Sequence, residues 1–410
     1  MLIGLDCAAP ELLFDRWLND LPNLKSLCQV GVHGTLRSCD PPITVPAWSV
    51  MMSSKSPGRL GVYGFRNRAG HSYDRHLIAN SLAIKEDRLW DILSRSGKRS
   101  IVIGVPGTYP PQPLNGLLVG DFLTPDTSCD YTYPPELKEE IARVVGEYVL
   151  DVRDFRSGNK NKILGDIYEM TRKRFRLARH LLAKEDWDYF MMVEMGVDRI
   201  HHAFWDDMDS AHRFYKPGNK FETAIHDYYQ EVDREIGELL AFADDATAVL
   251  LVSDHGAKRM DGGICINEWL IANGYLALAE KPGSAIPLSK AKVDWSRTKV
   301  WGDGGYYARV FLNVAGREPN GTIAPEDYEK VREELVAGLK AIRDENGQEM
   351  GTQVFRPAGD GIPGGREIEG LRITDIAPTI LQSFGLPVPQ DMEGTARNSF
   401  FAVSPSAKNL

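Results

Sequence analysis

The sequence predicts an α/β fold with a mostly parallel central sheet and helices on both of its faces. Short runs of strand-forming residues alternate along the chain with amphipathic helical patterns. The strand runs are apolar almost throughout, which is typical of strands that are covered on both faces. The 410 residues are 43% hydrophobic and 26% charged, an ordinary composition for a globular protein.

The first expected strand is the apolar run that opens the chain and ends at Asp6, which is too short and too acidic at its end for a signal peptide. Three later runs share its form, so the expected strands are Met1–Leu5, Arg99–Gly104, Tyr189–Glu194 and Ala248–Ser253. Segments with helical periodicity lie between and after them: Arg88–Arg95, Pro135–Val145, Ile163–Lys184, Phe221–Ala241 and Tyr328–Ile342. The basic residues of 163–184 alternate with apolar ones, as on a covering helix with a solvated outer face.

The organisation of the chain favours one catalytic domain. No internal repeat and no linker separates independent halves, so we expect a single domain over residues 1–400. The stretch from about 257 to 325 is rich in glycine and aromatic residues and could form an inserted lid or subdomain. Irregular stretches between the elements should lie over the carboxyl edge of the sheet, where ligands bind in such folds.

Charge and composition exclude several classes of partner. The formal net charge is −9, so a nucleic acid polymer is not an expected partner. The sequence contains no apolar run of about 18 residues, so no membrane span is expected. The five cysteines are odd in number and form no CxxC pair, which is typical of reduced thiols in a cytoplasmic protein.

Three of the expected strands deliver a carboxylate at their ends. Asp6 follows the first strand, and Asp254 and His255 follow the strand at 248–253. After the strand at 189–194, Asp198 and His202 are four residues apart, so on a helix they share one face, while His201 is rotated by about 100°. Each motif alone also fits a capping aspartate beside a chance or surface histidine. Together they indicate a metal site, and mixed Asp and His ligands suit zinc, manganese or iron(II).

Thr44 lies between Pro42 and Pro46 in a segment that contains a further candidate group. Pro46 is well placed as the first residue of a helix that runs through Trp48 and Met52. Thr44 would then lie at or just before a helix N-terminus, where an anion is favoured. Metal coordination could activate its hydroxyl as a nucleophile, while the simpler alternative is an N-cap.

Taken in chain order, Asp6, "ITVPAWSVMMSSKSPGRLGVYGF", "GVDRIHHAFW", "SDHG" and "ITDIAPTILQSFGLPVPQDMEG" resemble the alkaline phosphatase superfamily. The resemblance is closest to its type I phosphodiesterase/nucleotide pyrophosphatase branch, including relatives described as phosphohydrolases or phosphomutases, and it covers residues 1 to about 395. It implies an alkaline phosphatase-like fold and two divalent metal ions beside a threonine or serine nucleophile. Zn²⁺ is the expected metal, with Mn²⁺ or Mg²⁺ as alternatives. Carried over by position, one metal site takes Asp6, Thr44, Asp254 and His255, and the other takes Asp198 and His202.

The sequence departs from this family pattern at two places. The family normally supplies a further histidine to the second metal from the C-terminal third, but His255 is the last histidine of this chain. Asp360 is the candidate substitute, with Glu367 and Asp303 as weaker ones, and a weak or absent second metal is the alternative. Where the family commonly places a phosphate-binding asparagine, this chain has Phe65, and Arg66 or Arg68 could replace that contact.

The expected activity is a metal-dependent cleavage of a small phosphate ester through a phosphothreonine on Thr44. A phosphodiester, a nucleotide and a phosphomonoester all remain open as substrates. Trp205 and Tyr306 are candidates for a pocket that stacks on a nucleobase, with core packing as the alternative. The competing functions are a phosphomutase or phosphotransferase with the same nucleophile, a degenerate member that binds a phosphorylated ligand or a protein without turnover, and a zinc-dependent transferase or lyase acting on another anion.

Overall fold

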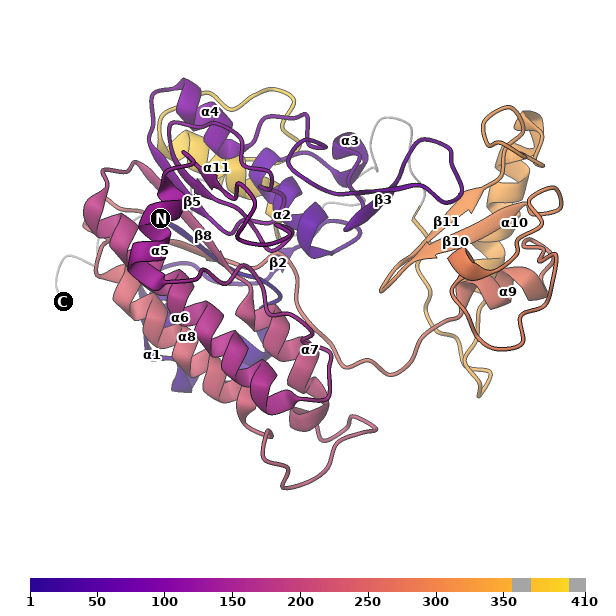
Figure 1. The fold of residues 1–410 in the computed structure, drawn as a ribbon, viewed down its shortest axis with the longest axis horizontal. Helices are drawn as coiled ribbons and strands as arrows, with labels where there is room; N and C mark the ends of the chain where they lie inside the picture. The colour runs from indigo at the N-terminus through magenta and orange to yellow at the C-terminus, as the bar shows by residue number, and fades with distance from the viewer. Residues whose placement is uncertain (356–369, 398–410) are drawn as a thin grey trace. The chain divides into compact units, whose positions relative to one another are not determined.

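The computed structural model describes residues 1–355 and 370–397. The chain divides into two compact units, each with its own core (Figure 1). Of the described residues, the larger unit comprises Met1–Phe65, Ala79–Asp261 and 370–397, and the smaller unit comprises Arg66–Ile78 and 262–355. The smaller unit therefore includes most of the stretch predicted as an insertion, together with a segment that lies almost 190 residues earlier. Its action as a lid stays a prediction.

A six-stranded sheet forms the centre of the larger unit, in the order β7-β6-β5-β8-β1-β9. All neighbouring strands are parallel except β7 and β6. The strands are β1 (Leu2–Leu5), β5 (Ser100–Ile103), β6 (Gly116–Val119), β7 (Thr132–Tyr133), β8 (Tyr189–Glu194) and β9 (Leu250–Val252). The four predicted strands are present as β1, β5, β8 and β9, and the mostly parallel α/β prediction is confirmed.

Both faces of this sheet are buried because successive side chains of a strand point to opposite sides. In β1, Ile3 and Leu5 join one apolar cluster, whereas Leu2 joins the other. The first cluster also contains residues of α1 (Pro22–Val30), α5 (Leu137–Val145), α6 (Lys160–Lys184), α7 (Gly196–Met208) and α8 (Ala224–Leu240). The second contains residues of α2 (Thr44–Ser53), α3 (Pro57–Leu60), α4 (Leu89–Arg95) and α11 (Ile376–Ser383). Helices therefore cover both faces, as Figure 1 shows.

The predicted helices correspond to α4, α5, α6, α8 and α10, with ends that differ by up to three residues. A parallel strand pair, β2 (Leu36–Arg37) with β12 (Leu371–Arg372), links the beginning of the larger unit to its C-terminal segment. Among the described helices, none has both the length and the apolar character needed to cross a membrane.

The smaller unit is built around two antiparallel strand pairs. One pair is β3 (Arg66–Arg68) with β4 (His76–Ile78), and the other is β10 (Val300–Gly304) with β11 (Ala308–Leu312). Its helices are α9 (Ile266–Ala272) and α10 (Tyr328–Lys340). Trp301 of β10 and Leu270 of α9 contribute to its separate core.

Candidate active site

The carboxylates predicted at three strand ends come together at the carboxyl edge of the central sheet. Strand β1 lies between β8 and β9, and the register pairs Leu5 with Glu194 and Gly4 with Val252. Asp6 directly follows β1, and its backbone N–H donates to the carbonyl of Glu194 at 3.0 Å. Asp254 follows β9, and Asp198 lies in the first turn of α7. Because adjacent parallel strands end at the same edge, residues 6, 198 and 254 converge.

Thr44 is the first residue of α2 and is buried beside this group. Its hydroxyl oxygen lies 3.3 Å from Asp6 Oδ1 and 3.1 Å from His255 Nε2. Trp48, one turn later on the same helix, donates from its indole nitrogen to Asp6 Oδ2 at 2.7 Å. Helix α2 therefore places a hydroxyl against the carboxylate of Asp6 and holds that carboxylate by its second oxygen.

Asp254 and His255 complete the other side of the group. The Asp254 Oδ1 atom accepts a hydrogen bond from the Cys7 backbone N–H at 3.1 Å, and Cys7 itself has a left-handed φ of 66°. His255 Nε2 lies 3.4 Å from Asp254 Oδ2 and 3.7 Å from Asp6 Oδ1. His255 Nδ1 is 3.0 Å from the Gly256 carbonyl, which can only accept, so Nδ1 carries a proton and Nε2 faces the carboxylates.

Burial and crowding of like charges perturb the ionisation of these groups. Burial, reinforced by Asp254, raises the pKa of Asp6 well above its usual range. Burial likewise raises the pKa of Asp254 to about 6. Burial alone would lower the pKa of His255, but the neighbouring Asp254 and Asp6 carboxylates raise it to about 9. Raised carboxyl pKa values mean that burial disfavours the negative forms of Asp6 and Asp254, and a bound cation would offset this cost.

The side chains of Asp6, Asp198, Asp254 and His255 are of the types that bind a divalent metal ion. Ligand atoms of Asp6, Asp198 and His255 all lie within 4.8 Å of one another. Asp254 Oδ2 is buried without a hydrogen-bond partner among the described residues. The bond from His255 Nδ1 to a backbone carbonyl is the second contact that metal-binding histidines usually make. Two carboxylates and one imidazole nitrogen also match the ligand types that zinc and manganese accept.

Asp198 and His202 are adjacent as predicted, but Asp198 has a cationic partner that the sequence did not suggest. His202 Nε2 lies 3.4 Å from Asp198 Oδ1, and the Arg199 Nη1 group donates to Asp198 Oδ2. Arg199 also binds both oxygens of Asp151, at 2.7 and 2.9 Å. Burial alone would raise the pKa of Asp198, but His202 and Arg199 hold it well below its usual range.

His201 is buried and does not reach the surface. Its Nε2 atom lies 3.2 Å from the Tyr229 hydroxyl, and burial lowers its pKa to about 3, so the ring is neutral. Trp205, a predicted substrate contact, packs its ring edge-on against His201 and donates to Asp209 at 3.2 Å. These contacts place Trp205 in the helix layer beside α8.

The remaining predicted contacts are spread over the chain. Phe65 belongs to the larger unit, where its partly exposed ring packs edge-on against Phe122 at 5.9 Å. Arg66 and Tyr306 belong to the smaller unit, in β3 and in the turn between β10 and β11. Asp360, the candidate third ligand of the second metal, lies outside the described residues.

Two contacts of the site were not foreseen. The Trp48 bond to Asp6 follows from its position four residues after Thr44, which places both side chains on one face of α2. Nothing in the sequence indicates that Asp151 contacts Arg199, because Asp151 lies in an irregular segment 48 residues earlier.

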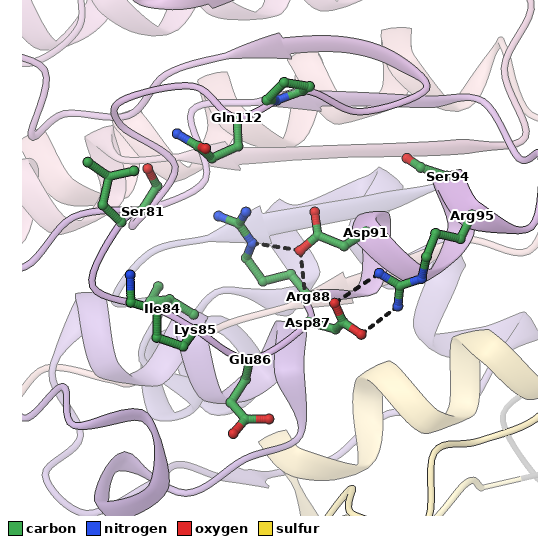
Figure 2. A pocket seen from close by; sticks show the side chains of 12 residues that line it. Ser81, Ile84, Lys85, Glu86, Asp87, Arg88, Asp91, Ser94, Arg95 and Gln112 are labelled. Atoms are coloured by element: carbon green, nitrogen blue, oxygen red, sulfur yellow. Dashed lines mark hydrogen bonds and ion pairs between the residues drawn. The ribbon is translucent and has the colours of Figure 1, made fainter.

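A pocket of about 460 Å³ lies elsewhere in the larger unit (Figure 2). It is lined by residues from the segment 81–95 and by Gln112 and Pro113, and none of the predicted site residues lines it. Four charged residues of its lining pair with one another, Arg88 with Asp91 and Arg95 with Asp87.

Comparisons with known proteins bear on the fold and the family of this chain. Residues 1–381 match the family model described as type I phosphodiesterase / nucleotide pyrophosphatase. The alkaline phosphatase PafA has a similar structure, with a TM-score of 0.57 at 13% identity, covering 98% of this chain and 99% of that one. Phosphonoacetate hydrolase from Sinorhizobium meliloti 1021, solved with phosphonoacetate, gives a TM-score of 0.52 at 15% identity, covering 83% and 72%. No curated protein matches the chain.

The structural likenesses show an alkaline phosphatase fold, and the family match over residues 1–381 includes the positions of all candidate ligands. Members of this superfamily use divalent metal ions, in keeping with the ligand group around Asp6. The chain belongs to the type I phosphodiesterase/nucleotide pyrophosphatase family and is a hydrolase that acts on ester bonds.

Proposed function

We propose that the protein is a metal-dependent hydrolase of small phosphate esters that uses Thr44 as its nucleophile. The observation that supports this proposal most directly is the position of the Thr44 hydroxyl. It lies at the start of a helix, buried, and 3.1 to 3.3 Å from a histidine nitrogen and a carboxylate oxygen. A threonine that served only as an N-cap would direct its oxygen to a backbone N–H of its own helix.

Each residue of the group has a role in this proposal. Asp6, Asp254 and His255 would hold one divalent cation, with Zn²⁺ the expected ion. Such a cation lowers the pKa of a nearby hydroxyl and balances the charge of phosphoryl oxygens. Trp48 keeps Asp6 in place through the indole hydrogen bond. The first backbone N–H groups of α2 have no acceptor within the helix and favour an anion at its N-terminus.

The reaction proceeds in two displacements at phosphorus. The Thr44 oxygen attacks in line, the bond between phosphorus and the leaving oxygen breaks, and a phosphothreonine forms. Water then attacks the phosphothreonine, releases phosphate or a phosphomonoester and restores the hydroxyl. The helix N-terminus of α2 stabilises the negative charge on the phosphoryl group in both steps.

The substrate in this proposal is a small phosphate ester, with a nucleotide or another phosphodiester favoured by the family match. Phe65 is partly exposed and could pack against an apolar or aromatic group of the substrate. The five cysteines are all free, which supports a reducing compartment such as the cytoplasm.

The proposal is tested by replacing the nucleophile. Thr44→Ala should lower kcat by about 10³-fold or more, because the attacking oxygen is absent, while Thr44→Ser should retain part of the activity. The assay uses bis-p-nitrophenyl phosphate and p-nitrophenyl phosphate, with Zn²⁺ or Mn²⁺ restored after chelation. A brief reaction quenched in acid should trap phosphate on the wild type and not on Thr44→Ala.

Ser49→Ala is the matched control, because the Ser49 hydroxyl is on the same helix but donates to the Val45 carbonyl. It should stay within about threefold of the wild type, because the change removes only a hydrogen bond to the backbone of its own helix. Full activity in Thr44→Ala would exclude the mechanism. Phosphate transferred to an added alcohol in preference to water would favour the phosphotransferase alternative.

A further inference from the structure

The second metal ion implied by the family resemblance does not fit Asp198 as the structure arranges it. Asp198 Oδ2 accepts from the Arg199 Nη1 group, and Asp198 Oδ1 faces His202 Nε2 at 3.4 Å. His255 Nε2 lies at the same 3.4 Å from Asp254 Oδ2, so the feature that sets Asp198 apart is the bond from Arg199, whereas Asp254 Oδ2 has no hydrogen-bond partner among the described residues. Among the described residues, Asp6, Asp198 and His255 lie close enough together to share a metal ion, and His202 is not part of this group. The charge of Arg199 therefore decides whether Asp198 takes part.

Arg199 is held rigidly beside Asp198. Its Nε and Nη2 groups bind the two oxygens of Asp151 at 2.7 and 2.9 Å. The guanidinium also lies over the rings of Phe155, at 4.5 Å, and Phe122, at 5.3 Å. Only 6% of Arg199 is exposed, so this fork of hydrogen bonds is almost completely removed from solvent.

A metal ion bound to Asp198 would lie close to this guanidinium. A metal–oxygen bond of about 2.1 Å added to a direct hydrogen bond separates the two cations by less than about 5 Å. At that distance in a buried site, like charges repel strongly. Arginine cannot relieve the repulsion by losing its proton, whereas a lysine could.

We propose that Arg199 is the permanent counter-ion of Asp198 in place of a second metal ion, so that the centre binds a single divalent cation. Asp151 orients the guanidinium from behind, and Arg199 in turn orients Asp198 beside Asp6 and His255. His202 then serves as a hydrogen-bond partner of Asp198 rather than as a ligand. This inference rests on the metal dependence in the proposed function and replaces the two-metal centre expected from the resemblance.

The test counts metal ions in the purified full-length protein. The protein is stripped with a chelator and titrated with Zn²⁺, and separately with Mn²⁺, against a competing metal-sensitive dye. The wild type should bind one tight equivalent per chain. Two tight equivalents would overturn the inference while leaving the proposed function intact, whereas no tight binding would contradict the proposed function itself.

A variant of Arg199 tests whether this residue limits the number of metal ions that the protein binds. Arg199→Gln removes the charge and should gain a second equivalent, while the wild type, which keeps the charge, should stay at one. A folded Arg199→Gln protein that still binds one equivalent would show that Arg199 is not what replaces the second ion. Circular dichroism and thermal unfolding establish which variants are folded.

His202→Ala provides a second test if the Arg199→Gln protein does not fold, because the His202 side chain is partly exposed. This variant should bind one equivalent with a dissociation constant within about threefold of the wild type. Loss of an equivalent, or a dissociation constant raised more than tenfold, would make His202 a ligand and overturn the inference.

Discussion

At the scale of single residues, the chemistry of the site depends on how firmly Asp6 is held. The carboxylate is fully buried, and its two oxygens face different groups, Thr44 on one side and Trp48 on the other. The indole N–H donates a hydrogen bond to this carboxylate, and hydrogen bonds to charged groups contribute about 1.5–3 kcal/mol in proteins. The orientation of Asp6 thus depends on a residue that would not itself touch the substrate.

Trp48→Phe tests this support directly. The variant keeps an aromatic ring but removes the donor to Asp6, so metal affinity should fall by about 10- to 100-fold. The measurement is the same dye competition with Zn²⁺, together with kcat on a phosphodiester. Trp187→Phe is the matched control, since Trp187 precedes β8 at the opposite edge of the sheet. Unchanged metal affinity in a folded Trp48→Phe protein would show that the indole bond does not matter.

At the scale of elements, the site depends on the turn from β8 into α7. Glu194 ends β8 fully buried, and its Oε1 atom accepts from the Gly196 backbone N–H at 2.7 Å and from Thr171 and Tyr228 at 3.1 Å. These bonds fix the start of α7 and therefore the direction of Asp198. Gly196 has no room for a side chain, because a Cβ there would overlap the Tyr228 hydroxyl.

Two glycine-to-alanine changes in helices should have opposite effects on stability. Gly165 is exposed in the interior of α6, and a Cβ there meets nothing within 4 Å, so Gly165→Ala should stabilise the protein by about 0.5–1 kcal/mol. Gly196→Ala should destabilise it by about 1–3 kcal/mol through overlap in a packed site. Urea unfolding measures both, and effects of the same sign would contradict the packing around Gly196.

At the scale of the whole molecule, the protein has separate apolar cores in its two units. The sheet and its covering helices enclose two clusters in the larger unit, and the smaller unit has a third of its own. Units with separate cores unfold independently unless a large apolar interface couples them. We therefore expect two transitions in calorimetric unfolding.

Tyr73 ties the segment 66–78 into the smaller unit. Its ring stacks on Trp295 with centroids 3.7 Å apart, and its hydroxyl donates to Asn313 at 2.7 Å. Tyr73→Ala should lower the stability of the smaller unit by about 2–3 kcal/mol and leave the transition of the larger unit unchanged. Ile286→Ala, at an exposed position of the same unit, is the control and should shift neither. A shift of both transitions by Tyr73→Ala would show that the units unfold together.

The strand–helix alternation and the main candidate residues can be predicted from the sequence alone, and the reason is physical. Buried strands require continuous apolar runs, and a carboxylate that ends such a run is costly unless it has a function. Asp6, Asp254 and His255 can therefore be recognised from short stretches of sequence, and so can Thr44 beside its prolines. Strands β6 and β7 are not predicted, because β6 has only Leu117–Val119 after Gly116 and β7 consists of Thr132 and Tyr133, so neither shows an apolar run that separates it from a loop.

The fold class and the chemical types at the three strand ends can be predicted from the sequence, because both are encoded over a few neighbouring residues. The partners of those groups follow only from the three-dimensional packing. The pairing of Arg199 with Asp151, the bond from Trp48 to Asp6, and the assembly of one unit from segments 66–78 and 262–355 join residues far apart in the chain. Such contacts arise from how the sheet and helices pack, and no local pattern specifies them.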